Sequence, residues 1–228
     1  MSNDLRNRIL WLVLFSIAMG FLETAVVVYL RELYYPNGFS FPLTVMDQRV
    51  GIIELLREAA TVIMLSGVGV LAGRSFNQRF AFFLVAFAIW DIFYYVFLKL
   101  LIDWPESFFT WDILFLIPVP WIGPVLAPCL ICLAMLLLAF VMIYRELTHP
   151  NIGLNGREWL LLVAGSLVVV ASWTSDFLAY SSNKGPAVAD TSLTLLSTYV
   201  PQTYNWYVFS AGECILLATV FFFWRRTS

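Results

Sequence analysis

The chain has 228 residues, of which 61% are apolar and only 12% are charged, and its formal net charge is −2. An average soluble domain carries about 25% charged residues, so this composition indicates an integral membrane protein in a lipid bilayer. No basic patch points to nucleic acid, and the single histidine, His149, excludes haem sites with two histidines and histidine-rich zinc sites.

Six stretches reach the roughly 20 apolar residues that are needed to cross a hydrocarbon core. They are residues 9–30, 51–73, 80–101, 122–144, 159–180 and 204–224. The first follows two arginines, as a signal peptide would, but its apolar length predicts a retained helix. We expect an all-α, polytopic bundle of about six transmembrane helices, forming one integral membrane domain over residues 1–228.

The first two stretches carry acids where lipid is expected. Glu23 lies about two helical turns before the end of the first stretch, and Glu54, Arg57 and Glu58 lie within the first two turns of the second. One interpretation makes Glu54 and Glu58 ligands or acid/base groups, with Arg57 holding an anionic substrate group or neutralising the acids. The other is structural, with Arg57 bridged to a carboxylate of a neighbouring helix, Glu23 or Asp91. A third has the start of this helix outside the bilayer as an amphipathic entry segment.

The third stretch contains Asp91 near its middle, within the sequence WDIFYY. Tyr95 and Lys99 follow at successive i+4 positions toward the same end. An aromatic environment suits a carboxyl group that donates a proton, and a simple hydrogen bond from a tyrosine or an ion pair with Arg57 explains Asp91 equally well.

The loop after the third stretch contains an apolar run that is too short to span a membrane and is interrupted by prolines. Proline cannot continue a helix. We therefore predict a short re-entrant or interfacial element near residues 112–120. Asp112 is expected to cap its first turn.

The last three stretches contain the remaining candidates. Cys129 and Cys132 form a Cys-x-x-Cys pair, for which apolar packing is the favoured role because no loop cysteine accompanies it. Asp176 lies one turn from the end of the fifth stretch, and Glu213 lies near the middle of the sixth. Asp91 and Asp176 form an aspartyl dyad only if their helices meet.

All of these acids lie at the midplane or toward one side of the predicted membrane. A charge at the centre of a transmembrane helix costs roughly 2.5–3.5 kcal/mol on insertion scales, so a one-sided set indicates a shared, water-accessible cavity. With Arg57 and Lys99 as the only cations, six ionised carboxylates leave a net charge of −4. The cavity is therefore expected to share protons or to bind a cation or a small polar headgroup.

Basic residues in the short loops predict the orientation. Eight arginines lie at the ends of the stretches that share a side with both termini, and four Lys or Arg residues lie at the opposite ends. We expect a cell-membrane protein with both termini in the cytoplasm and a cavity that opens outward.

Residue type and predicted depth in the membrane divide the candidate site residues into two groups. The catalytic candidates are Glu54, Glu58 and Asp91. The substrate-binding candidates are Glu23, Arg57, Tyr95, Asp176 and Glu213. The first hypothesis is a pocket that binds a cation or headgroup, in a small membrane-embedded enzyme. The alternatives are a proton- or cation-coupled transporter that acts as a homo-oligomer, and a non-catalytic subunit that packs on partner membrane subunits. The sequence leaves the metal and the cofactor open.

Overall fold

The structure is a computed structural model that describes residues 3–149, 152–184 and 192–227. Six of its helices are long and apolar enough to cross a membrane, which confirms the predicted all-α, multi-pass fold. These helices are α1 (Asn3–Tyr34), α2 (Gln48–Ala72), α3 (Phe76–Ile102), α4 (Leu126–Thr148), α5 (Gly156–Asn183) and α7 (Trp206–Thr227).

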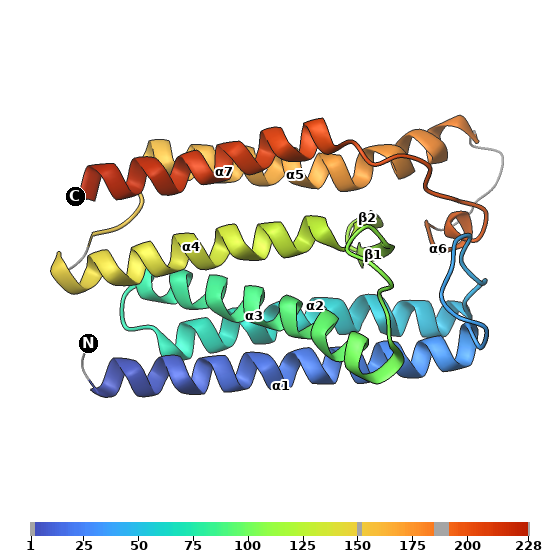
Figure 1. Cartoon of the computed structure of the whole chain (residues 1–228), viewed down its shortest axis with the longest axis horizontal. Coiled ribbons are helices and arrows are strands. Elements are labelled where there is room, and N and C mark those ends of the chain that lie inside the picture. Colours follow the sequence, from blue (N-terminus) through green and yellow to red (C-terminus); the bar gives the residue numbers. More distant parts are fainter. Residues whose placement is uncertain (1–2, 150–151, 185–191, 228) are drawn as a thin grey trace.

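The six helices run along one axis in layers (Figure 1). Helices α1 and α2 each pack mainly on α3 and touch one another far less, α3 packs on α4, and α5 pairs with α7. The start of α1 and the end of α7 share one end of the bundle, which we call the termini end. The connection between α1 and α2 and the short helix α6 (Ser192–Leu196) lie at the opposite end, which we call the far end.

Polar side chains fix where several helices begin. The carboxylate of Asp47 accepts hydrogen bonds from the backbone N–H groups of Arg49 and Val50 at the start of α2. Ser75 accepts from the N–H of Gln78 at the start of α3. These caps satisfy backbone donors that have no partner within the helix. Helix α2 therefore begins three residues before the predicted span.

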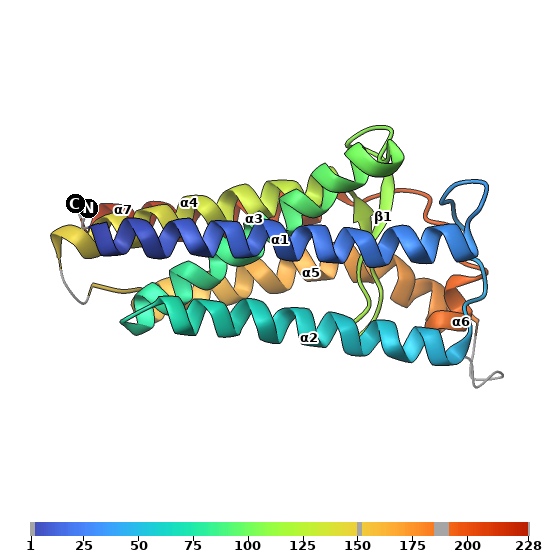
Figure 2. The same cartoon turned by 90° about the horizontal axis from the view of Figure 1, so that it is seen from below.

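The predicted short element near residues 112–120 is an antiparallel β-hairpin of β1 (Trp111–Phe115) and β2 (Trp121–Pro124). In Figure 2, β1 runs across the bundle from the end of α3 toward α2. The capping role predicted for Asp112 is wrong, because Asp112 lies within β1, paired with Gly123. Residues 122–124 belong to β2 rather than to the fourth span, since the backbone becomes helical only after Pro124.

A close approach of α1 to α3 sets the position of the polar residues that follow. A Cβ atom on Gly20 would lie 2.8 Å from the backbone oxygen of Trp90, so only glycine allows this contact. One turn later, the hydroxyl of Thr24 donates a hydrogen bond to the backbone oxygen of Tyr94 at 3.1 Å. Glu23 and Asp91 are the sequence neighbours of Thr24 and Trp90, so this contact between α1 and α3 holds both near the place where the two helices meet.

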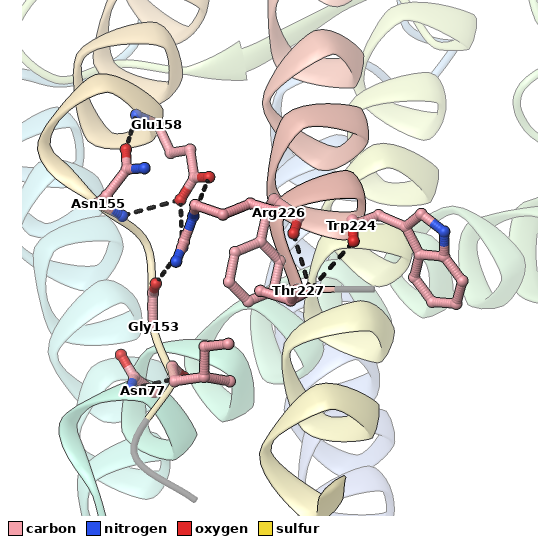
Figure 3. Close-up of polar contacts among 9 residues, drawn as sticks. Asn77, Gly153, Asn155, Glu158, Trp224, Arg226 and Thr227 are labelled. Atoms are coloured by element: carbon pink, nitrogen blue, oxygen red, sulfur yellow. Dashed lines mark hydrogen bonds and ion pairs between the residues drawn. The ribbon is translucent and has the colours of Figure 1, made fainter. Parts of the chain in front are cut away.

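An ion pair between a buried carboxylate and an exposed arginine lies at the termini end (Figure 3). Glu158 is only 2% exposed, and its carboxylate accepts hydrogen bonds at 2.8 Å from Nε and Nη2 of Arg226 and from the backbone N–H of Asn155. Arg226 also donates to the backbone oxygen of Gly153 at 2.6 Å, and Asn77 donates to the oxygen of Ile152. The end of α7 is thus tied to the connection between α4 and α5, which is itself tied to α3.

We expect Arg226→Ala to lower the free energy of unfolding by about 1–3 kcal/mol, because it leaves the buried Glu158 carboxylate without its cation. Thermal unfolding of the detergent-solubilised protein measures the change. Arg225→Ala removes the same charge from an exposed side chain in the same helical turn and is expected to cost no more than about 0.5 kcal/mol. Equal losses in the two variants would contradict this account of the ion pair.

Candidate functional site

Arg57 of α2 is the centre of the polar residues between α1 and α2. Its Nε donates to Oε2 of Glu54 at 2.9 Å, and its Nη2 binds the other carboxylate oxygen, so the pair is bidentate. Its Nη1 pairs with Oε2 of Glu23 on α1. Thr61, one turn further along α2, donates to the backbone oxygen of Arg57 and lies 3.5 Å from the Glu23 carboxylate. The bridge to Glu23 is the structural alternative that the sequence left open for Arg57.

Glu58 forms its hydrogen bond with the hairpin and no ion pair with Arg57. It is 7% exposed, and its Oε2 accepts a hydrogen bond at 2.9 Å from the backbone N–H of Leu116, just after β1. A backbone donor inside a membrane bundle needs such a partner, since lipid offers none. Glu58 therefore fixes the hairpin against α2.

Asp91 of α3 lies among aromatic side chains, as its sequence indicates. Its carboxylate accepts a hydrogen bond of 3.2 Å from the thiol of Cys132 on α4, and Cys132 is buried. The hydroxyl of Tyr95 does not reach Asp91 and instead donates to Asp112 at 3.1 Å. Among the ion pairs of the described residues, none joins Asp91 or Glu58 to a Lys or Arg side chain.

The hairpin brings a second arginine to the site, which was not predicted. Nη2 of Arg31, in the last turn of α1, lies 3.6 Å from Oδ1 of Asp112. The Arg31 guanidinium also lies over the ring of Trp104, with Cζ 3.7 Å from the ring centroid. Burial raises the pKa of Asp112 to about 6, although Arg31 and the hydrogen bond from Tyr95 both lower it. Asp112 is only 3% exposed, so burial outweighs these two partners.

A cavity of about 130 Å³ lies between α1, α2, α3 and the hairpin. The connection between α1 and α2 also contributes to its wall. Five carboxylates and two guanidinium groups face it, which gives a net charge of −3 if all are ionised. The charged residues of the wall are Glu23, Arg31, Glu54, Arg57, Glu58, Asp91 and Asp112.

Two predicted site residues lie elsewhere in the described part of the chain. Asp176, on α5, accepts a hydrogen bond from the hydroxyl of Tyr199, and it does not line the cavity. Glu213, on α7, also lies outside the wall, and its Oε2 is buried without a hydrogen-bond partner. Both were placed by depth along their helices, but α5 and α7 form a separate layer on the other side of α4 (Figure 1). Asp91 lines the cavity and Asp176 does not, so no observed contact brings these two acids together as an aspartyl dyad.

Sequence reasoning missed Arg31 and Asp112 as site residues. The spacing of Glu23, Val27 and Arg31 at i, i+4 and i+8 places all three on one face of α1, and all three line the cavity. This signal was present in the sequence. Asp112 gave no such signal, because its position depends on how the hairpin folds back between the helices.

The cavity is closed toward the termini end by packed apolar side chains. Met19, Leu65 and Ala86 lie one turn or so beyond Glu23, Thr61 and Trp90 on the three helices, and all belong to one buried cluster. No protein-family model, curated protein or solved structure matches this chain. The interpretation of the cavity therefore depends on its own geometry.

We expect Arg57→Gln to lower the free energy of unfolding by about 3–5 kcal/mol, because it leaves Glu23 and Glu54 as unpaired charges in a largely buried position. Thermal unfolding in detergent measures the loss. The triple variant Arg57→Gln, Glu23→Gln, Glu54→Gln removes all three charges and is expected to regain most of the stability. A single variant as stable as the unsubstituted protein would show that the bridge does not hold α1 to α2.

Proposed function

We propose that this multi-pass membrane protein binds a small organic cation, an ammonium group, in the cavity between α1, α2, α3 and the hairpin. The observation that carries the proposal is the imbalance of charge in the wall. Arg57 forms ion pairs with Glu23 and Glu54, and Arg31 lies beside Asp112, whereas no Lys or Arg side chain of the described residues forms an ion pair with Glu58 or Asp91. A cation placed between Glu58 and Asp91 would relieve the cost of burying them.

The aromatic side chains around Asp91 favour an ammonium group over other cations. Trp90, Tyr94 and Tyr95 all line the cavity. Aromatic rings attract ammonium groups through their faces, and a carboxylate beside them adds direct charge pairing. Trp90 is 6% exposed and its Nε1 has no hydrogen-bond partner, so it is available to donate to an oxygen of the ligand. A volume of about 130 Å³ has room for a small headgroup.

A metal ion is the competing occupant. Among the described residues, no three His, Cys, Asp or Glu side chains are placed to hold one metal ion. Calcium takes six to eight oxygen ligands and magnesium about six. The carboxylates would have to move to form such a site, whereas an ammonium group fits the present arrangement of separate acids and rings.

The candidate roles follow from these contacts. We assign Glu58 and Asp91 as the ligand-binding carboxylates, and as the proton acceptors if the bound group reacts. Glu54 and Glu23 hold Arg57, so we assign them as positioning residues. The packed cluster of Met19, Leu65 and Ala86 favours a site that is open to one side only, and a transporter would need that cluster to separate. The excess of arginines near the termini end supports a cytoplasmic position for that end and a cavity that faces outward.

The test is binding of ethanolamine to the purified protein at neutral pH, by calorimetry, with sodium chloride of equal ionic strength as the salt control. Because ion pairs of buried groups are strong, we expect Glu58→Gln or Asp91→Asn to weaken binding by about tenfold or more. Glu213→Gln is the matched control, since it neutralises a membrane acid outside the cavity.

Two results would contradict the proposal. One is ethanolamine binding that is unchanged by Glu58→Gln and Asp91→Asn. The other is saturable binding of calcium or magnesium that needs Glu58 and Asp91, with no binding of ethanolamine.

A further inference from the structure

We propose that Arg31 is the anion-binding residue of this cavity, so that its ligand is a zwitterion with an ammonium group at Glu58 and Asp91 and a phosphate or carboxylate group at Arg31. This inference rests on the proposed function and names the chemical class of the ligand more narrowly.

The guanidinium of Arg31 is held in place by rings rather than by hydrogen bonds. It lies over Trp104 and Phe39, with Cζ 3.7 Å and 4.6 Å from the two ring centroids. Arg31 is 9% exposed and lines the cavity. Stacking of this kind fixes the plane of a guanidinium and leaves its N–H groups at the edge free to bind.

The hydrogen bonds of Arg31 are incomplete. Its contact with Asp112 is 3.6 Å, which is too long for a good hydrogen bond, and its Nη1 has no partner. Arg57, the other arginine of the wall, binds two carboxylates. A buried donor without a partner costs about 1–3 kcal/mol, and the planar fork of an arginine matches the two oxygens of a phosphate or carboxylate. Beside its long contact with Asp112, Arg31 thus keeps a buried Nη1 donor that the described residues leave unbound and that an added anion would satisfy.

The opposite charges lie at different depths. Glu23 and Arg31 are eight residues apart on α1, so their Cα atoms are separated by about 12 Å along the helix axis. Arg31 is the one nearer the far end, beside Tyr35 and the connection to α2. Asp91 lies deeper, next to Trp90, whose backbone contacts Gly20. A bound zwitterion would therefore point its ammonium group into the bundle and its anionic group toward the far end.

The same chemistry is found in a lipid headgroup and in a soluble small molecule. Phosphoethanolamine carries both charges on a short chain, ethanolamine carries only the cation, and inorganic phosphate carries only the anion. These three probes separate the two halves of the proposed site.

The experiment compares the affinities of the three probes for the unsubstituted protein, Arg31→Gln and Arg31→Lys. We expect phosphoethanolamine to bind about tenfold or more tightly than ethanolamine, because a charged hydrogen-bonded pair is added. Arg31→Gln should remove this difference while leaving ethanolamine binding within about threefold. Arg31→Lys keeps the positive charge without the planar fork of N–H groups. It should recover part of the affinity difference between phosphoethanolamine and ethanolamine. Arg49→Gln, which removes an exposed arginine near the start of α2, is the matched control.

The outcomes separate this inference from the proposed function. If ethanolamine binds through Glu58 and Asp91 but phosphoethanolamine binds no more tightly, or its advantage survives Arg31→Gln, the inference is wrong and the proposed function stands. If neither amine binds, both are wrong. Phosphoethanolamine binding that needs Arg31 but is unaffected by Glu58→Gln and by Asp91→Asn also overturns the zwitterion.

A second comparison identifies the source of the ligand. Phosphoethanolamine binding that is lost in nanodiscs of phosphatidylethanolamine and present in nanodiscs of phosphatidylglycerol supports a lipid headgroup in the cavity. Equal binding in the two supports a soluble zwitterion.

Discussion

The structure depends on charge pairing at one level along the axis of its apolar helix bundle, where Arg57 lies. Arg57 binds Glu54 on its own helix and Glu23 on α1, so two helices that otherwise touch little are joined by an ion pair. The three charged groups hold α1 and α2 apart, and the cavity lies in the room that remains between them and α3.

The hairpin completes the fourth wall of that cavity. Backbone that is neither helical nor in a closed barrel is stable at membrane depth only where protein groups satisfy its polar atoms. Here the two strands pair with each other, Glu58 accepts the N–H of Leu116, and Asp112 meets Tyr95 and Arg31. The residues that bind the hairpin are therefore the same residues that give the cavity its charge.

The sequence was informative about residues whose position depends on one helix. The six spans and the acids on α2 follow from helical spacing and composition. Depth along a helix was not enough to place Asp176 and Glu213, because the layer in which α5 and α7 pack is decided by contacts between helices. Asp112 was missed for the same reason, since the position of the hairpin is set by tertiary packing, whereas the helical spacing of Arg31 from Glu23 could have identified it. The sequence predicts a net negative charge for the cavity, and the charged side chains of its wall also sum to a negative charge. The residues differ, because the wall contains Asp112 and Arg31 and lacks Asp176, Glu213 and Lys99.

The proposed function requires an acidic, water-accessible cavity that opens at the far end and is closed toward the termini end. Cysteine labelling measures this directly, in a background with Cys129→Ala, Cys132→Ser and Cys214→Ala. Thr61→Cys lines the cavity, and Leu65→Cys, one turn further along α2, lies in the packed apolar cluster. A membrane-impermeant cationic methanethiosulfonate applied from the far side is expected to label Thr61→Cys, to be slowed by ethanolamine, and to leave Leu65→Cys unlabelled. Labelling of Thr61→Cys only from the side of the termini, or equal labelling of both positions, would contradict the account.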